Sequence, residues 1–215
     1  LVIIEGVLLF NLWSVRPRKA PKFPPAVTVK GKIAIVIDDW GYNLNNLPVL
    51  EEIKYPITAS ILPNLSYSKA IAEELHNLGV EVILHLPMEP YEKFRLEQNT
   101  IMALMDEKTI KGIIEQDLAS IQYAKGASNH MGSKATGDLK TMTIIFNELK
   151  KRNLFFLDSL VSKKSICMDL ASKINLRCAK RDVFLDNEEN AEYIKLQINK
   201  LKRKARAYGH AVGIG

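Results

Sequence analysis

The sequence is short of the residue types and patterns that mark several common functional classes. It has two cysteines, Cys167 and Cys178, whose spacing fits no zinc or redox motif, so they are either paired in an exported protein or two free thiols. No glycine-rich loop follows any apolar run, which removes the main support for a nucleotide site. The composition is that of an ordinary globular protein, with 47% hydrophobic and 25% charged residues in a chain long enough for one good core.

The excess of positive charge is confined to two parts of the chain. The net charge is +6, and the basic residues concentrate in residues 16–32 and 195–206, while the central stretch is mixed in sign. We interpret these two runs as a basic flank and the solvated face of a helix, with an anionic polymer as the weaker alternative. We therefore expect no nucleic-acid partner.

The first 31 residues are expected to differ from the rest. Residues 1–13 are largely apolar, but Glu5 and Asn11 interrupt them and they are too short to span a bilayer. Residues 16–25 are proline-rich and basic, as in a linker. We interpret 1–31 as a remnant of a signal peptide or membrane anchor with a linker, on a chain that continues beyond both ends of this sequence. An exported, periplasmic or membrane-anchored protein is expected; the basic cluster keeps a cytoplasmic location open.

From residue 32 onward, apolar runs alternate with amphipathic segments. This alternation is typical of a parallel sheet with helices packed outside it, either as an open doubly wound sheet or as a barrel. We favour an α/β fold of barrel type, incomplete, with about seven strands. The expected strands are 33–39, 57–62, 80–86, 127–131, 154–157, 177–180 and 211–215, and the expected helices are 43–53, 66–78, 106–123, 141–151, 165–174 and 188–207.

Two adjacent carboxylates, Asp38 and Asp39, end the first apolar run. One aspartate at a strand end often only caps the next turn. Two in a row favour a functional site, because neighbouring like charges are costly unless a cation or a proton separates them. Ligands of parallel α/β folds bind at the carboxyl ends of the strands, where both side chains are expected.

Further polar side chains follow the other predicted strands, so they are expected at the same end of the sheet: His85, Asn129, His130, Asp158 and the acidic residues of 181–186. A carboxylate with two imidazoles suits zinc, and a second carboxylate could take a proton from water. Structural roles stay open for several of these residues. His85 could be a buried histidine bonded to backbone, Asp158 and Asp186 could be caps, and Trp40 could be a packing group.

Five motifs together carry a resemblance to a known family. The chain from residue 32 to 215 resembles the divergent polysaccharide deacetylase family in the order and spacing of Ile37-Asp-Asp-Trp-Gly41, Leu84-His-Leu-Pro-Met-Glu-Pro90, Asn129-His-Met-Gly-Ser133, Asp158-Ser159 and Arg181-Asp-Val-Phe-Leu-Asp186. The resemblance implies an incomplete (β/α)7-type barrel of the glycoside hydrolase/deacetylase kind and a catalytic domain that is usually outside the cytoplasm.

The resemblance also implies roles for particular residues. Asp38 matches the catalytic base and Asp39 a metal ligand, with His85 and His130 replacing the superfamily's usual pair of histidines four residues apart. Arg181 is expected to orient or neutralise Asp38 or a nearby acid. The family tends to carry a histidine just beyond the last strand, so a general acid is expected after Gly215. The remaining motif residues, expected at the substrate or supporting the ligands, are Glu89, Asn129, Asp158 and Asp182.

The expected activity is metal-dependent removal of N-acetyl-like groups from a cell-envelope carbohydrate, with a divalent metal, zinc above others, as cofactor. Two alternatives stay open. Asp38 and Asp158 could act as the two carboxylates of a glycosidase, which needs no metal. Since the usual histidine pair is absent, the chain could also be a noncatalytic envelope protein that binds glycan or another partner.

Overall fold

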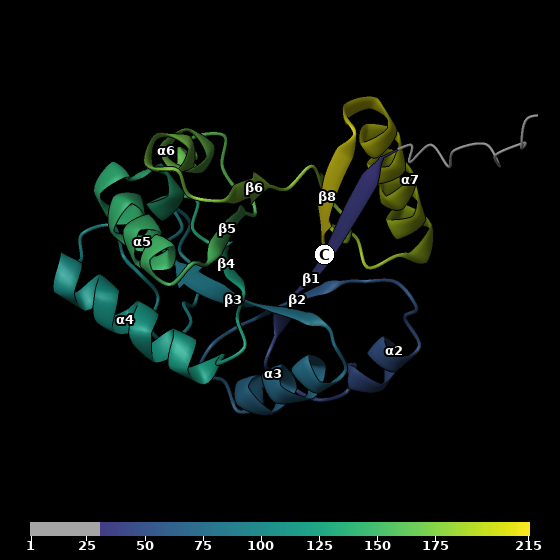
Figure 1. Cartoon of the computed structure of the whole chain (residues 1–215), viewed down its shortest axis with the longest axis horizontal. Helices are drawn as coiled ribbons and strands as arrows, with labels where there is room; N and C mark the ends of the chain where they lie inside the picture. The colour runs from purple at the N-terminus through teal and green to yellow at the C-terminus, as the bar shows by residue number, and fades with distance from the viewer. Residues whose placement is uncertain (1–30) are drawn as a thin grey trace, which may run out of the picture.

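The computed structural model describes residues 31–215, and they form one sheet of eight parallel strands. The strands follow the order β6-β5-β4-β3-β2-β1-β8-β7, and the sheet curls into a half-barrel with helices on its outside (Figure 1). The strands are β1 (Lys32–Trp40), β2 (Thr58–Ile61), β3 (Glu81–Met88), β4 (Gly126–Met131), β5 (Phe155–Asp158), β6 (Cys178–Lys180), β7 (Val183–Phe184) and β8 (His210–Ile214). The predicted incomplete barrel is therefore confirmed.

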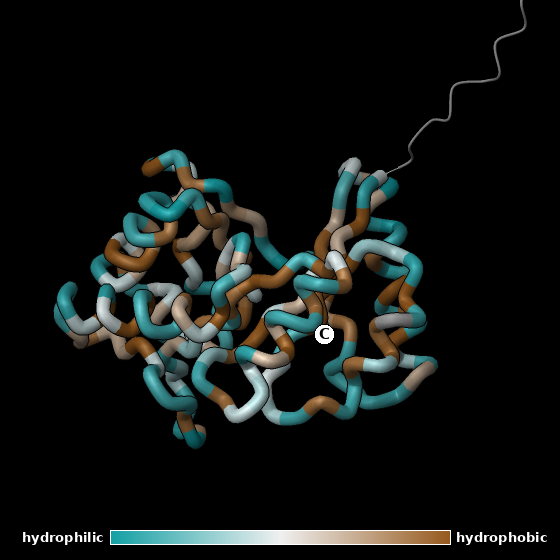
Figure 2. The backbone as a smooth tube through the Cα atoms, turned by 60° about the horizontal axis from the view of Figure 1, so that its bottom comes forward, coloured by the Kyte–Doolittle hydropathy of each residue, from teal (hydrophilic) through white to brown (hydrophobic). Residues whose placement is uncertain are grey.

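The helices follow the strands as the alternation of the sequence predicts. They are α2 (Leu47–Glu51), α3 (Ser68–Asn77), α4 (Glu107–Ser120), α5 (Leu139–Lys151), α6 (Cys167–Ile174) and α7 (Ala191–Tyr208), with a short 3-10 turn η1 (Ala135–Gly137). Figure 2 shows hydrophobic and hydrophilic positions alternating along these outer helices. In α5, for example, Met142, Ile145, Phe146 and Leu149 are buried, which is the 3.6-residue spacing of a helix packed on a sheet.

The sheet buries residues on both of its faces. The outer face packs against the helices, and Phe156 of β5 meets Phe146 of α5 with ring centroids 5.0 Å apart. The inner face has a smaller apolar layer made by Val36, Ile83, Leu157 and Ile214, from strands β1, β3, β5 and β8. The polar side chains at the carboxyl ends of the strands lie next to this inner apolar layer.

The barrel does not close by strand pairing. Strands β6 and β7 lie at the two edges of the sheet and do not pair with each other in the described chain. Only residues 181 and 182 join them, and in Figure 1 the chain after β6 crosses the opening towards β8. The sequence did not predict β7, because its two residues are too few to show the period of a strand.

Three other expectations need correction. Residues 43–46 are not helical; the side chain of Asn43 accepts from the backbone N–H of Asn45, the Asx turn that competes with a helix start. Helix α7 begins at Ala191 and not at residue 188, because Asn190 accepts from the N–H groups of Glu192 and Tyr193. Asp186 is therefore not its cap. The expected anchor and linker, residues 1–30, lie outside the described residues, among which no helix is long and apolar enough to cross a membrane.

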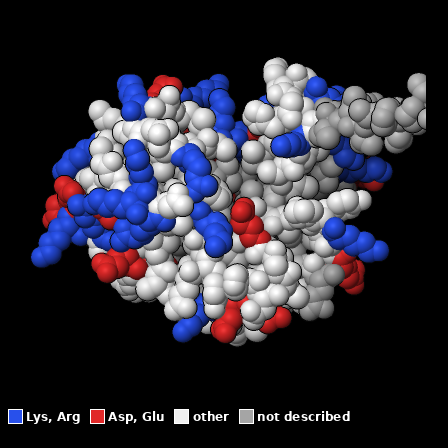
Figure 3. All heavy atoms as spheres, viewed as in Figure 1, with Lys and Arg blue, Asp and Glu red and all other residues white. Residues whose placement is uncertain are grey.

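Figure 3 shows Lys and Arg gathered over the part of the molecule formed by α4, α5 and α6. The lysines of α4 and α5 are Lys108, Lys111, Lys140, Lys150 and Lys151. In the sequence they lie among acidic residues, and the longest basic run there, residues 150–152, has only three members, so no long basic run predicts this area. It arises because α4 and α5 lie side by side. Part of the charge is balanced there, since Glu148 pairs with Lys151 at 2.7 Å and with Arg152 at 2.6 Å.

A buried carboxylate joins α4 to two loops. Asp117 is fully buried, and its Oδ1 accepts hydrogen bonds from the side-chain amides of Asn64, at 2.7 Å, and Asn99, at 3.2 Å. Its Oδ2 has no partner among the described residues. Burial raises the pKa of Asp117 to about 6, although the two amides oppose the rise.

The raised pKa makes this contact dependent on pH. A carboxyl group that binds its proton more tightly in the folded state stabilises the fold below pH 4, and the contribution is lost as the pH rises from 4 to 6. We expect Asp117→Asn to remove this fall, which amounts to at most about 3 kcal/mol for a shift of about two pKa units. Guanidinium unfolding between pH 4 and 7 measures it. Glu115→Gln, at an exposed position of the same helix, should keep the wild-type slope, and equal slopes in Asp117→Asn and wild type would contradict the prediction.

Candidate metal centre

The alternation of side chains along each strand brings the site together. Asp38 lies two residues after Val36, and His85 lies two residues after Ile83, so both stand on the inner face just above the apolar layer. In β4, Ser128 pairs with His85, and His130 follows two residues later on the same face. Each side chain therefore reaches the carboxyl end of the half-barrel from a different strand.

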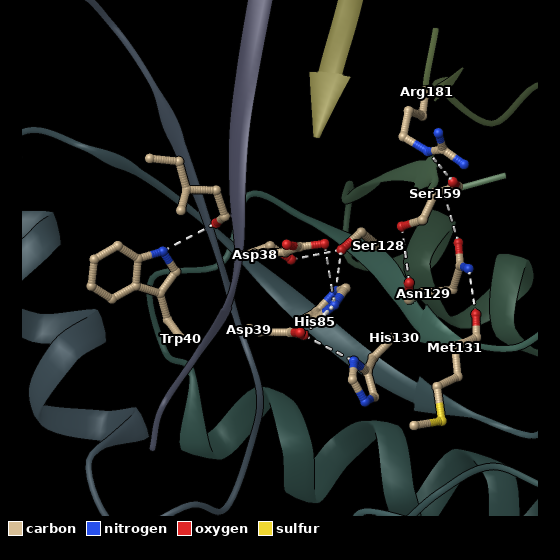
Figure 4. Close-up of polar contacts among 12 residues, drawn as sticks. Asp38, Asp39, Trp40, His85, Ser128, Asn129, His130, Met131, Ser159 and Arg181 are labelled. Atoms are coloured by element: carbon tan, nitrogen blue, oxygen red, sulfur yellow. Dashed lines mark hydrogen bonds and ion pairs between the residues drawn. The ribbon is translucent and has the colours of Figure 1, made fainter. Parts of the chain in front are cut away.

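Asp39 reaches the same face through a bulge. In a regular strand it would point away from Asp38, but its φ is +57° and the pairing of β1 with β2 shifts register between Ile37 and Trp40. A left-handed backbone is uncommon for a residue with a side chain, although aspartate tolerates it better than most. Figure 4 shows the result, with Asp38 and Asp39 both directed towards His85.

Three ligand atoms converge here. Asp39 Oδ1 is 3.1 Å from His85 Nε2 and 2.9 Å from His130 Nδ1, and the ligand atoms of the three residues all lie within 4.8 Å of one another. Ligands bound at about 2.0–2.1 Å around a tetrahedral zinc ion are separated by roughly 3.3–3.5 Å. The two contacts to Asp39 are slightly shorter than this separation. His85 is buried, whereas the side chain of Asp39 is 56% exposed, so a metal held by these three residues would be accessible from solvent. The donor set fits a divalent metal.

The two aspartates differ in their electrostatics. Burial alone would raise the pKa of Asp39, but hydrogen bonds from His130 and His85 outweigh it and hold the pKa well below its usual range. Burial raises the pKa of Asp38; His85 opposes this, while the charges of Asp39 and Asp186 add to it. One carboxylate is therefore kept charged by the imidazoles, and its neighbour binds a proton more readily.

Asp186, one of the acidic residues of 181–186 that the sequence places at this end of the sheet, lies beside the site. A Cβ atom on Gly215 would lie 3.0 Å from Asp186 Oδ1, and the Gly215 carbonyl accepts from the N–H of Asp38 at 3.2 Å. Asp186 therefore lies close enough to Asp38 for its charge to raise the pKa of that carboxyl group, and it does not lie at the start of α7. Its place after the apolar residues 183–185 is the same signal that indicated Asp38, whereas its alternative role as a cap of the last helix is not observed.

A chain of hydroxyl groups beside His85 was missed by the sequence analysis. Ser128 Oγ lies 2.7 Å from His85 Nδ1, and Ser60 Oγ lies 2.6 Å from Ser128 Oγ. All three residues are buried. Serine is common in loops and on surfaces, so only the strand positions of Ser60 and Ser128 on the inner face could have revealed them.

Asn129 and Arg181 hold the backbone near the site. The Asn129 side chain donates to the Met131 carbonyl and accepts from the N–H of Ser159, which fixes the turn after His130 to the end of β5. Arg181 donates to the carbonyls of Ser159 and Leu160, at 2.6 and 2.9 Å, and not to Asp38. Burial lowers the pKa of Arg181, and the charges of Asp158 and Asp38 oppose this.

Three other acidic motif residues bind the chain itself. Asp158 is buried, and its two oxygens accept from the N–H of Leu160 and the hydroxyl of Ser165, so it is a cap. Glu89 pairs with Lys134 at 2.6 Å and accepts from a loop N–H. Asp182 accepts from the N–H of Val212, and Lys204 donates to its carbonyl.

These contacts leave Asp158 poorly placed as the second carboxylate of a glycosidase. Trp40 is likewise a packing group, since it is buried and donates to the Ile37 carbonyl.

Comparisons with known proteins agree with this arrangement. The family model described as Divergent polysaccharide deacetylase matches residues 35–215. The uncharacterized protein YibQ of Escherichia coli K12 is 38% identical over 185 residues, which are 86% of this chain and 58% of that protein. An uncharacterized protein of Haemophilus influenzae Rd is 31% identical over 186 residues, 86% of this chain and 66% of that protein.

A solved structure shares the fold. The crystal structure of an uncharacterized protein from Agrobacterium tumefaciens C58 aligns with a TM-score of 0.81 at 23% identity, over 86% of this chain and 76% of that one. At this identity the likeness concerns the fold alone.

The left-handed backbone at Asp39 predicts that a glycine variant is more stable than an alanine variant, the reverse of the usual order in a strand. We expect Asp39→Gly to be more stable than Asp39→Ala by about 1 kcal/mol, because glycine adopts this conformation without a steric cost. Both variants lose the carboxylate, so guanidinium unfolding of the pair isolates the backbone effect. At exposed Ile33, in the same strand, the order should reverse, with Ile33→Gly the less stable. The same order at both positions would contradict a left-handed Asp39.

Proposed function

This chain belongs to the divergent polysaccharide deacetylase family, and we propose that it is a metal-dependent hydrolase that removes N-acetyl or similar acyl groups from a cell-envelope carbohydrate outside the cytoplasm. The observation that carries the proposal is the convergence of Asp39, His85 and His130 beside a second carboxylate, Asp38. Because the chain spans 58% and 66% of its two relatives, the proposal concerns this part of the protein.

Asp39, His85 and His130 would hold the metal, and zinc is the ion that best suits one carboxylate and two imidazoles. When bound in such a site, a divalent ion polarises an acyl carbonyl and makes a water molecule more acidic. The buried His85 and the charged Asp39 fix the position of two ligand atoms. His130, whose Nδ1 faces Asp39, completes the set from the neighbouring strand.

Asp38 would accept the proton of the attacking water. Its Oδ2 lies 3.7 Å from His85 Nε2, so the Asp38 carboxylate is next to the ligand atoms. The carboxylate that contacts both imidazoles closely is that of Asp39. A carboxylate whose pKa is raised by burial is a stronger base than an exposed one, which favours proton transfer near neutral pH. Arg181 would act on Asp38 through its charge alone, because its hydrogen bonds go to carbonyls.

The surroundings suit a polar substrate. A pocket beside the carboxylates is lined by Asp38, Asp39, Tyr42, Asn43 and Asn46, whose amide and hydroxyl groups can bond to sugar hydroxyls. Tyr91 and Phe94, on the loop after β3, are exposed and offer apolar faces near the same end of the barrel. These features support a carbohydrate as the substrate.

The ligand assignment predicts which variants lose metal. Zinc content of the purified protein should fall in Asp39→Ala and in His130→Ala, because each removes one of three protein ligands. His76→Ala is the matched control, since His76 stacks on Tyr123 at 4.0 Å, away from the three ligands. Unchanged zinc in Asp39→Ala or His130→Ala would overturn the assignment.

The role of Asp38 predicts a separate kinetic effect. Asp38→Asn should keep the zinc content and lower kcat about 10²–10⁴-fold in the release of acetate from N-acetylated oligosaccharides, because proton transfer is lost while the ligands remain. Chelation of the wild type should abolish the release, and added zinc should restore it. Release that survives complete chelation would favour a glycosidase-like chemistry instead, and glycan binding without release under any divalent ion would favour a noncatalytic protein.

A further inference from the structure

We infer that Ser128 and Ser60 are positioning residues of the candidate metal centre, because their hydroxyl chain lets His85 present Nε2 either as a donor to Asp39 or as a free lone pair to a metal ion. The inference rests on the proposed function, since it assigns His85 to a metal. It concerns two residues outside the family motifs named above. Figure 4 shows Ser128 directed at the ring of His85, next to the Asp38 carboxylate.

The chain runs across three neighbouring strands. Ser60 belongs to β2, His85 to β3 and Ser128 to β4, and the contacts are 2.6 Å between the two hydroxyls and 2.7 Å from Ser128 Oγ to His85 Nδ1. The exposed fraction of each residue is 2% or less. Water therefore does not compete for these groups, and each must find its hydrogen-bond partner inside the protein.

A hydroxyl group can either donate a hydrogen bond to a histidine nitrogen or accept one from it, whereas a carbonyl or carboxylate can only accept. Such an acceptor would fix the proton on Nδ1 of His85 at all times. Without a metal, the lone pair on Nε2 would then face the Asp39 carboxylate across 3.1 Å, an unfavourable contact between two acceptors. A hydroxyl can donate to Nδ1 instead, and Nε2 then carries the proton and donates to Asp39.

The same chain also supports the metal-binding state. When Nδ1 donates to Ser128, Nε2 is left with a free lone pair, which is the form that binds a metal. The proton of the Ser128 hydroxyl then needs a buried acceptor, and Ser60 Oγ provides it. Each hydroxyl keeps its own proton and only reverses the direction of its bond, while the imidazole moves its proton between its nitrogens with no change in net charge.

A purely structural role for the two serines is the competing explanation. Ser68 shows what such a role looks like: it is buried, donates to the Leu62 carbonyl and accepts from the N–H of Leu65, with no contact to the site. Ser68→Ala therefore matches the loss of a buried hydroxyl and its two bonds. It should lower the stability and leave metal binding unchanged.

Zinc affinity and the tautomer of His85 test the inference together. The affinity is measured by competition with a chelator at fixed pH, and the tautomer by long-range ¹H–¹⁵N spectra of the full chain with and without zinc. We expect wild-type His85 to carry its proton on Nε2 without zinc and on Nδ1 with zinc. Ser128→Ala should weaken zinc binding about 10-fold or more, which is the usual effect of losing a hydrogen-bond partner of a ligand, and Ser60→Ala should weaken it less.

The outcomes separate this inference from the proposed function. A wild-type protein that binds no zinc would overturn both. Zinc binding by the wild type with wild-type affinity in Ser128→Ala and Ser60→Ala would overturn only the positioning role, as would a His85 tautomer that zinc does not change. Weaker binding in Ser68→Ala equal to that in Ser128→Ala would also overturn it, because the effect would then follow from stability alone.

Discussion

The structure depends on how it places two adjacent carboxylates at the end of one buried strand. Asp38 and Asp39 would repel each other if both pointed into the half-barrel as charged groups without a partner. The left-handed backbone of Asp39 turns its carboxylate towards two imidazoles, which stabilise the charge, and leaves Asp38 where burial favours a proton. A local strain in the backbone thus gives the two side chains different chemical properties, although they are the same residue type and neighbours in sequence.

The layers of the inner face explain why this arrangement holds its shape. The lowest layer is apolar, with Val36 and Ile83 below the site, and it keeps water out of the barrel interior. In the neighbouring strands, Ser60 lies in register with Ile83 and Ser128 with His85. The two hydroxyls hydrogen-bond to each other, and that of Ser128 also hydrogen-bonds to His85. Of the ligand residues, Asp39 reaches the solvent, whereas His85 stays buried. Polarity and exposure therefore increase towards the open end of the half-barrel. The buried groups, His85 and the two serines, are held by contacts within the protein and not by water.

Much of the fold could be predicted from the sequence, because parallel strands buried on both faces are nearly continuous apolar runs. The position of a residue after such a run also predicted that Asp38, His85 and His130 would meet. The same rule selected Asp158, Glu89 and Asp182, which bind the chain's own backbone or a lysine. The rule fails here because it places a residue at the strand end but does not say what its side chain contacts. The bulge at Asp39 depends on its backbone angles, which no local pattern shows. The pattern placed Asp186 at a strand end, but it did not show that Gly215 would bring Asp186 close to Asp38.

The residues between the two edge strands show why a motif can be needed without taking part in chemistry. Strands β6 and β7 do not pair in the described chain, so only Arg181 and Asp182 connect the two edges of the half-barrel. Arg181 is bound to the carbonyls that follow β5, while Asp182 exchanges hydrogen bonds with Val212 in β8. The pair therefore ties the β5 side of the barrel to the β8 side, where the hydrogen bonds of a closed sheet are missing. Gly215, which follows β8, accepts from the N–H of Asp38, so this link also reaches the strand that carries the two aspartates.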